Sequence, residues 1–378
     1  MSNQALAVAP LTGKTQLRLA SGNGPVYRHV LQSPLRDAEP WEIPVINISR
    51  IFSASPSDRM AVAREFKKAA TNNGFFYISG HGIPSEAIDR AYNASLNFFR
   101  QPSSIKDRIN VNRSRHYSGW KPPGATRINS SESVDHRETF SWRYDPNLDP
   151  SVQDISAIPQ HISQYFRHET ESFYNSATAE LPKFQEDIKC YREKCLTLAR
   201  ALVRTLALSL DLPEDALDSK FSHPDATLVL NYYPSLPDDT ETVLTKDGSH
   251  LSVSLGSHTD FQLFTVLWQD SVGDLQVLNG DGQWLRAPPV PGTLTVNMGD
   301  YLQYITNGKY KSTVHRVQNI SGTERVSMPF FFGFNLNESC GVLESCVEPG
   351  DAKQLDEISC LEWVKRRMTA MKVSENEA

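Results

Sequence analysis

The 378-residue sequence predicts an α+β fold whose core is a double-stranded β-helix, or jelly roll. From residue 227 onward, short strand-like segments alternate with turn signals, which lie at Gly273 and at residues 279–282, 291–292 and 307–308. Before them, apolar residues recur at steps of three and four from Ile188 to Leu210, as in an amphipathic helix. We therefore expect helices that flank the jelly roll, and an α/β extension on its N-terminal side.

The N-terminal extension is expected at residues 39–150, after an arm. Residues 1–38 mix glycine, proline and scattered charges without an apolar period, so they predict a weakly ordered arm. The extension contains a strand, a helix, a strand and a helix in that order, at about residues 43–48, 60–72, 75–78 and 89–99. Residues 106–150 show no regular period and predict an irregular loop at the mouth of the core.

Three further regions follow the extension. Residues 151–220 are predicted to be a helical support of the barrel, in which Asp211-Leu212-Pro213 ends the long helix. Residues 221–340 form the predicted jelly roll. Residues 341–378 are expected to hold a C-terminal helix, which packs back on the body, and a tail.

Composition excludes several classes of protein. The 38 Lys and Arg residues against 44 Asp and Glu give a net charge of −6, and no basic cluster predicts nucleic-acid binding. The five cysteines lack C-x-x-C spacing, so they predict neither a disulfide framework nor a zinc module, and a reducing, cytoplasmic location fits. No run of 18 apolar residues and no signal peptide is found, so no membrane association is expected. The oligomeric state stays open.

His258, Asp260 and His315 are the candidate catalytic metal ligands. Side chains two apart on a strand share a face, so His258 and Asp260 are expected to point the same way. Two imidazoles and one carboxylate, with positions left open, suit a non-haem Fe(II) centre that also binds O₂ and a co-substrate. The sequence therefore predicts an iron site in the stretch from His258 to Ser327.

The sequence resembles the 2-oxoglutarate/Fe(II)-dependent dioxygenase superfamily, in the branch of isopenicillin N synthase, flavonoid oxygenases and gibberellin oxidases. The matching segments keep one fixed order. They are residues 72–84, 231–234 (N-Y-Y-P), 258–260 (H-T-D), 267–270, 274–277, 297–303, 306–310, 312–317 and 325–327 (R-V-S). The resemblance covers the chain from about residue 43 to residue 336 and implies Fe²⁺, O₂ and 2-oxoglutarate as cofactor and co-substrates.

The 2-oxoglutarate site is expected at Arg325. A guanidinium offers a rigid two-pronged fork to a carboxylate, and Ser327 on the same strand face offers a second donor. The resemblance adds Tyr233 and Asn231 from N-Y-Y-P. It implies hydroxylation, desaturation or ring formation on a small organic molecule of specialised metabolism, with release of succinate and CO₂.

The substrate is expected to lie against Phe331. Alternation from Arg325 and Ser327 sends Pro329, Phe331 and Gly333 into the barrel, and flavonoid oxygenases use an aromatic residue at the position that matches Phe331. Phe330 and Phe332 are expected to pack outward against helices. We expect a largely apolar small-molecule substrate, enclosed from the long loop by three further aromatic residues, Tyr117, Trp120 and Trp142.

The sequence leaves three alternative functions open. Isopenicillin N synthase-like oxidases have the same ligands without 2-oxoglutarate and use R-x-S for a substrate carboxylate, and aminocyclopropane carboxylate oxidase-like enzymes need ascorbate. A catalytically silent β-helix binding protein is a second alternative, although the triad and R-x-S are intact. A zinc hydrolase is a third, and no general base with motif spacing accompanies the ligands.

Overall fold

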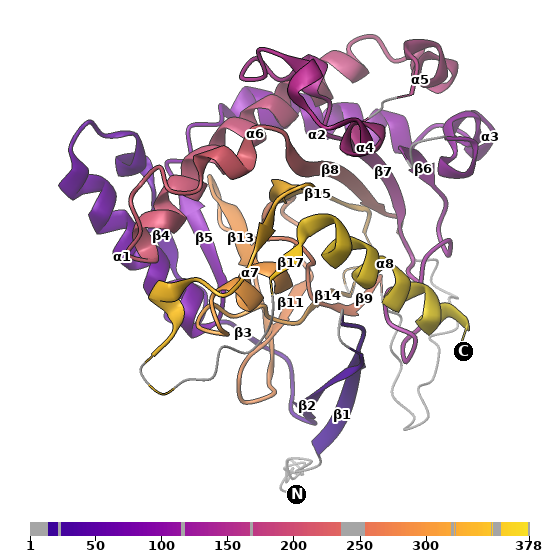
Figure 1. The fold of residues 1–378 in the computed structure, drawn as a ribbon. Coiled ribbons are helices and arrows are strands. Elements are labelled where there is room, and N and C mark those ends of the chain that lie inside the picture. Colours follow the sequence, from indigo (N-terminus) through magenta and orange to yellow (C-terminus); the bar gives the residue numbers. More distant parts are fainter. Residues whose placement is uncertain are drawn as a thin grey trace, which may run out of the picture.

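The computed structural model of this chain describes residues 14–21, 24–114, 118–166, 169–235, 254–318, 321, 323–348, 350 and 357–376. Within them, two mainly antiparallel sheets face each other and form the double-stranded β-helix (Figure 1). Apolar side chains between the sheets come from Phe75 and Tyr233 on one side and from Leu275 and Val317 on the other. The predicted jelly-roll core with flanking helices is thus confirmed.

The larger sheet has eight strands among the described residues. Its order is β4 (Val45–Asn47), β5 (Phe75–Ser79), β13 (Leu294–Met298), β10 (Phe264–Gln269), β15 (Arg325–Asn335), β8 (Pro224–Tyr233), β7 (Glu138–Arg143) and β6 (Gly119–Lys121). The smaller sheet has five, in the order β3 (Arg36–Asp37), β12 (Trp284–Arg286), β11 (Leu275–Leu278), β14 (His315–Val317) and β9 (Leu255–His258).

Two short ribbons complete the strands. β1 (Lys14–Leu19) pairs with β2 (Val26–Leu31), and β16 (Ser339–Cys340) pairs with β17 (Ile358–Ser359). Within residues 1–38, which were predicted to be a weakly ordered arm, Lys14–Leu19 and Val26–Leu31 thus form an antiparallel pair of strands. Most side chains of this pair are exposed or half-buried, and a few apolar ones, such as Leu19, join a small separate cluster. A strand that buries so little carries no clear apolar period in its sequence.

The helices lie mainly on the outer face of the larger sheet. They are α1 (Pro56–Asn72), α2 (Ser85–Phe99), α3 (Ser103–Lys106), α4 (Gln160–Ser163), α5 (Glu171–Thr178), α6 (Phe184–Ser209), α7 (Asp300–Ile305) and α8 (Cys360–Asn376). The predicted apolar stripe of α6, for example Leu198 and Leu202, joins one core with Phe330 and Phe332 of β15. In Figure 1, α1, α2 and α6 follow this face, whereas α8 runs across the other side of the molecule. None of the described helices has the length and apolar character needed to cross a membrane.

Residues 106–150 are more regular than expected. β6 and β7 extend the larger sheet beside β8, with Trp142 opposite Leu228 and Trp120 opposite Phe140. The prediction of an irregular mouth loop was wrong for Gly119–Lys121 and Glu138–Arg143, because β6 spans only three residues and the alternation of apolar and polar residues in β7 is short. The N-terminal region and the jelly roll consequently share one continuous sheet.

Candidate metal centre and adjoining cavity

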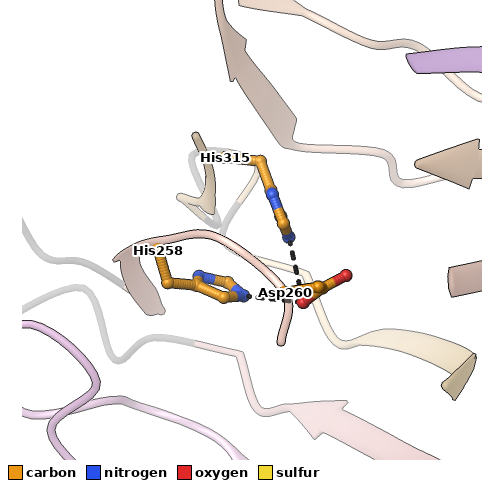
Figure 2. A group of neighbouring side chains, drawn as sticks. All are labelled: His258, Asp260 and His315. Carbon is orange, nitrogen blue, oxygen red and sulfur yellow. Dashed lines mark ion pairs between the residues drawn. The ribbon is translucent and has the colours of Figure 1, made fainter. Parts of the chain in front are cut away.

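His258, Asp260 and His315 meet at one point between the sheets. One ligand atom from each lies within 4.8 Å of the others. His258 ends β9 and His315 begins β14, and the two are directly paired across these strands, with ring centroids 4.2 Å apart. Asp260 lies beyond the end of β9, yet its Oδ1 is 3.7 Å from His258 Nε2 and 3.8 Å from His315 Nε2 (Figure 2). The described residues offer no other such group.

Hydrogen bonds orient all three side chains toward one another. Each imidazole donates Nδ1–H to a backbone carbonyl, His258 to Gly256 at 2.8 Å and His315 to Thr313 at 3.1 Å. Both Nε2 lone pairs are thereby left for a metal. Asp260 Oδ2 accepts from Thr265 Oγ1 at 2.5 Å and from Asn297 Nδ2 at 2.7 Å, so Oδ1 is left facing the imidazoles.

The charge states suit metal binding. Burial, assisted by the neighbouring His315, holds the pKa of His258 well below its usual value. Burial alone would raise the pKa of Asp260, but the two imidazoles and the hydrogen bonds from Asn297 and Thr265 lower it. At neutral pH the His258 imidazole is therefore neutral and the Asp260 carboxylate is ionised, which are the forms that coordinate a divalent metal.

The segment that carries Asp260 is held from the C-terminal helix. Arg367 of α8 is 2% exposed, pairs with Asp300 at 3.0 Å and donates to the carbonyl of Thr259 at 3.3 Å. Trp363 Nε1 donates to the carbonyl of Phe261 at 2.8 Å. Because both neighbours of Asp260 are tied to α8, the carboxylate keeps its place although no strand carries it.

A cavity of about 530 Å³ adjoins the three side chains. Arg325 lines it and is 1% exposed, with its guanidinium carbon 4.8 Å from the centre of the Tyr233 ring. Nη2 donates to Gln269 at 2.9 Å, whereas Nε and Nη1 have no partner among the described residues. A buried cation with unused donors is costly unless an anion binds there. The structure thus has a place for a carboxylate in the same cavity as the triad.

Ser327, Asn231 and Tyr233 line the cavity beside Arg325. On the paired strands β15 and β8, Arg325 lies opposite Tyr233 and Ser327 lies opposite Asn231. Asn231 Nδ2 donates to Ser327 Oγ at 3.3 Å, and Arg137 donates to Asn231 Oδ1 at 2.8 Å. Arg137 was not predicted to join the co-substrate pocket, because nothing in its local sequence shows that it meets Asn231 of N-Y-Y-P in the folded chain.

Phe331 lines the cavity as alternation predicts, together with Pro329. Phe330 and Phe332 instead belong to the core on the helix side. Gly333 also follows the inward parity, and a Cβ at this position would come within 2.3 Å of Gln262 Oε1. On the far side, α8 contributes cavity-lining residues, which are Leu361, Val364, Lys365 and Met368.

Trp120 and Trp142 do not lie in the cavity, contrary to our expectation. They are 3% and 1% exposed and belong to the core on the helix side. Trp142 stacks on Tyr174 of α5 with ring centroids 4.9 Å apart, and Trp120 Nε1 donates to Glu138 at 2.6 Å. Strand parity puts both indoles on the face opposite Arg143. The predicted contact of Tyr117 falls on residues 115–117, outside the described part of the chain.

The position of Trp142 leads to a stability prediction. Trp142→Ala removes a fully buried indole and is expected to lower the free energy of unfolding by about 3–5 kcal/mol. Urea titration followed by circular dichroism measures this change. An unchanged unfolding midpoint combined with an altered substrate preference would support the expectation that Trp142 contacts the substrate.

Two family models match this chain. The 2OG-Fe(II) oxygenase superfamily matches residues 224–334, and the non-haem dioxygenase in morphine synthesis N-terminal matches residues 43–164. The 2-oxoglutarate-Fe(II) type oxidoreductase ppzC of Metarhizium rileyi is 52% identical over 368 residues, with 97% of each chain covered. The chain belongs to the 2OG-Fe(II) oxygenase superfamily.

Other members of the superfamily agree with this assignment. The 2-oxoglutarate-Fe(II) type oxidoreductase hxnY of Emericella nidulans is 30% identical over 330 residues, covering 86% of this chain and 89% of that protein. A Neurospora crassa protein, whose crystal structure is described in complex with alpha-KG, superposes with a TM-score of 0.70 over 86% of this chain and 96% of that one. At 22% identity, this similarity shows the shared fold alone.

Membership of this superfamily decides the reaction class. The protein is an oxidoreductase that depends on Fe(II) and 2-oxoglutarate, as the relatives named for both show. The structure fits both groups, because the His-Asp-His cluster has the donor set of an iron site and Arg325 has unused buried donors. The zinc hydrolase, the silent binding protein and the oxidase without 2-oxoglutarate are therefore set aside.

Proposed function

We propose that His258, Asp260 and His315 hold Fe(II), and that Arg325 with Ser327 holds the distal carboxylate of 2-oxoglutarate. The observation that carries this proposal is the pair of unused nitrogens on buried Arg325, in the same cavity as the three ligands. Tyr233 and Asn231 complete the co-substrate pocket by supporting the guanidinium and the serine from the neighbouring strand.

The bound iron and 2-oxoglutarate supply oxidation of a C–H bond by O₂, with release of succinate and CO₂. The chain itself supplies orientation and a dry site. Arg325 and Ser327 fix one end of the co-substrate, and Thr265 and Asn297 keep the Asp260 carboxylate ionised and in place. Apolar walls that include Phe75, Leu255 and Leu275 keep water from the reacting groups.

The second substrate in this proposal is a small, largely apolar molecule of specialised metabolism. Phe331 and the α8 residues Leu361, Val364 and Met368 form an apolar part of the cavity wall. Solved neighbours support the small size of the substrate, since the Neurospora crassa protein is also described in complex with thymine, and JOX2 in complex with JA. The N-terminal family model is also named after morphine synthesis. Hydroxylation, desaturation and ring formation are the outcomes that such a site supports.

We place the reaction in the cytosol. The five cysteines are all free thiols in this structure, which suits a reducing compartment. Such a compartment also keeps iron ferrous, with ascorbate as an added reductant.

The test begins with anaerobic reconstitution. Protein loaded with Fe(II) is titrated calorimetrically with 2-oxoglutarate, and binding in the presence of the metal is the expected result. Candidate apolar metabolites are then screened in air, with ascorbate present, for succinate release above the rate without substrate. Absence of 2-oxoglutarate binding to the iron-loaded protein would contradict the proposed residue roles.

Phe331 gives a prediction about the substrate. Phe331→Ala is expected to weaken binding of the second substrate about 10- to 100-fold, because burial of an aromatic ring contributes about 1.5–3 kcal/mol. Substrate titration of the iron- and 2-oxoglutarate-loaded protein under anaerobic conditions measures the change.

Phe330→Ala is the matched control for Phe331→Ala. It removes the neighbouring ring on the opposite face of β15, inside the helix-side core. This variant is expected to lose stability by about 3–5 kcal/mol. Equal loss of substrate affinity in both folded variants would move the substrate to another wall of the cavity.

A further inference from the structure

The cavity contains a buried polar group that the proposed iron and 2-oxoglutarate sites do not use. Gln262 and Asp225 both line the cavity, and Gln262 Nε2 donates to Asp225 Oδ2. Gly333 makes room for this pair, because a Cβ at that position would collide with Gln262 Oε1. The glycine therefore permits a carboxamide to lie against β15.

Gln262 has an acceptor without a donor. Its Oε1 is buried and finds no hydrogen-bond partner in the described part of the chain, and the residue is 9% exposed. The Asp225 carboxylate accepts a hydrogen bond from Nε2, so the amide turns Nε2 toward Asp225 and places Oε1 in the space that a side chain at Gly333 would fill. A buried carbonyl oxygen without a donor is a place where a ligand donor gains affinity.

The register of the strands places this acceptor on the substrate side of the iron. Asp260 is hydrogen-bonded to Thr265, which is paired with Phe331 on β15. Arg325 lies toward one end of β15 from Phe331, whereas Gly333, opposite Asp225, lies toward the other end. Along β15, Gly333 with the Gln262 carboxamide therefore lies on one side of Phe331. Arg325, the proposed anchor of 2-oxoglutarate, lies on the other side.

Arg143 adds a donor close to this acceptor. It lines the same cavity and is paired with Thr227, two residues from Asp225 on β8. Its guanidinium makes no hydrogen bond or ion pair with any residue that the structure describes. Burial raises the pKa of Asp225, and the positive charge of Arg143 opposes that rise. Opposite charges in one region favour an uncharged ligand group over an ammonium or a carboxylate.

We propose that the second substrate carries an uncharged amide group, whose N–H donates to Gln262 Oε1 and whose carbonyl accepts from Arg143. This inference rests on the proposed function, because it takes this part of the cavity as the place of the second substrate. Asp225 acts as a positioning residue that holds the Gln262 carboxamide in the accepting orientation. The amide-bearing end is bound here, and the apolar remainder lies against Phe331.

The test compares three fluorinated probes by ligand-observed fluorine NMR on the full-length protein, loaded anaerobically with Fe(II) and 2-oxoglutarate. The probes are 4-fluorobenzamide, 4-fluoro-N,N-dimethylbenzamide and methyl 4-fluorobenzoate. The first has both amide functions, the second lacks N–H, and the third replaces nitrogen by oxygen. The wild-type protein is expected to bind the primary amide at least about tenfold more tightly than either analogue, since a site built for a donor rejects a ligand without one.

Variants assign the preference to the two residues. Gln262→Met keeps the length of the side chain without the acceptor. The ratio of the ester's dissociation constant to that of the primary amide is then expected to fall to about one. Arg143→Met is expected to weaken the primary and the dimethyl amide alike, and it tests the proposal independently if Gln262→Met does not fold. Gln164→Met, at another glutamine of the cavity wall, is expected to keep the full preference.

Two outcomes would overturn the inference. One is a wild-type protein that binds the amide no more tightly than the ester, which includes binding neither. The other is an unchanged preference in folded Gln262→Met, or an unchanged affinity for both amides in folded Arg143→Met. Calorimetry of 2-oxoglutarate on the same samples separates this failure from that of the proposed function. Intact co-substrate binding without amide preference refutes only the amide inference, and amide preference without co-substrate binding refutes only the roles of Arg325 and Ser327.

Discussion

Asp260→Asn and His315→Ala are each expected to lower turnover by more than about 100-fold and to remove stoichiometric iron. Loss of residues that only support metal ligands already costs about 10–100-fold in affinity or activity. Removal of a direct ligand from a three-residue set is expected to exceed that. Iron content after anaerobic desalting and succinate release are the two measurements, with circular dichroism to verify the fold.

Thr265→Val is the graded control for the iron site. It removes the 2.5 Å hydrogen bond to Asp260 Oδ2 without removing a ligand. Iron affinity is expected to fall within the range of about 10–100-fold. Full iron occupancy and activity in Asp260→Asn or His315→Ala would refute the assignment of these residues as ligands, whatever Thr265→Val does.

Arg325→Leu is expected to weaken 2-oxoglutarate binding by about 30-fold or more, since loss of one partner of a buried charge pair costs about 2–5 kcal/mol. Iron content is expected to stay close to that of the wild type, because the Arg325 guanidinium donates to Gln269 and lies over the Tyr233 ring, neither of which is a proposed ligand. Calorimetric titration of iron-loaded protein measures the co-substrate affinity. An unchanged affinity with weaker binding of the second substrate alone would mean that Arg325 holds a substrate carboxylate instead.

The same variant has a second readout in the apo protein. Without 2-oxoglutarate, Arg325 is a buried cation with two nitrogens that find no partner within the described ranges. Its replacement by leucine is therefore expected to leave the urea midpoint of the apo protein unchanged or to raise it. Added 2-oxoglutarate is expected to stabilise the wild type by mass action and to stabilise Arg325→Leu much less. Equal stabilisation of both proteins would place the co-substrate away from Arg325.

The sequence by itself determined the class of fold and predicted which side chains gather at the cavity. His258 and Asp260 were predicted from strand alternation and ligand chemistry, and His315 and Arg325 from the order of the motifs that resemble the superfamily. The inward parity of Ser327 and Phe331 followed from the alternation of side chains along a single strand, and the structure shows both at the cavity. The long stripe of α6 was predicted for a similar reason, since a helical period is a property of consecutive residues.

Only the tertiary structure decided which distant segments meet. Trp120 and Trp142 were expected at the mouth because residues 106–150 were interpreted as an irregular loop. The pairing of β7 with β8 and of β6 with β7 instead turns both indoles into the helix-side core. Asp260 keeps its place through contacts of its neighbours with α8, about a hundred residues away in the chain. Gln262 likewise meets Asp225, 37 residues away in the chain, only in the folded protein. Register across strands and docking of a terminal helix depend on packing between remote parts of the chain, and a local sequence pattern does not contain that information.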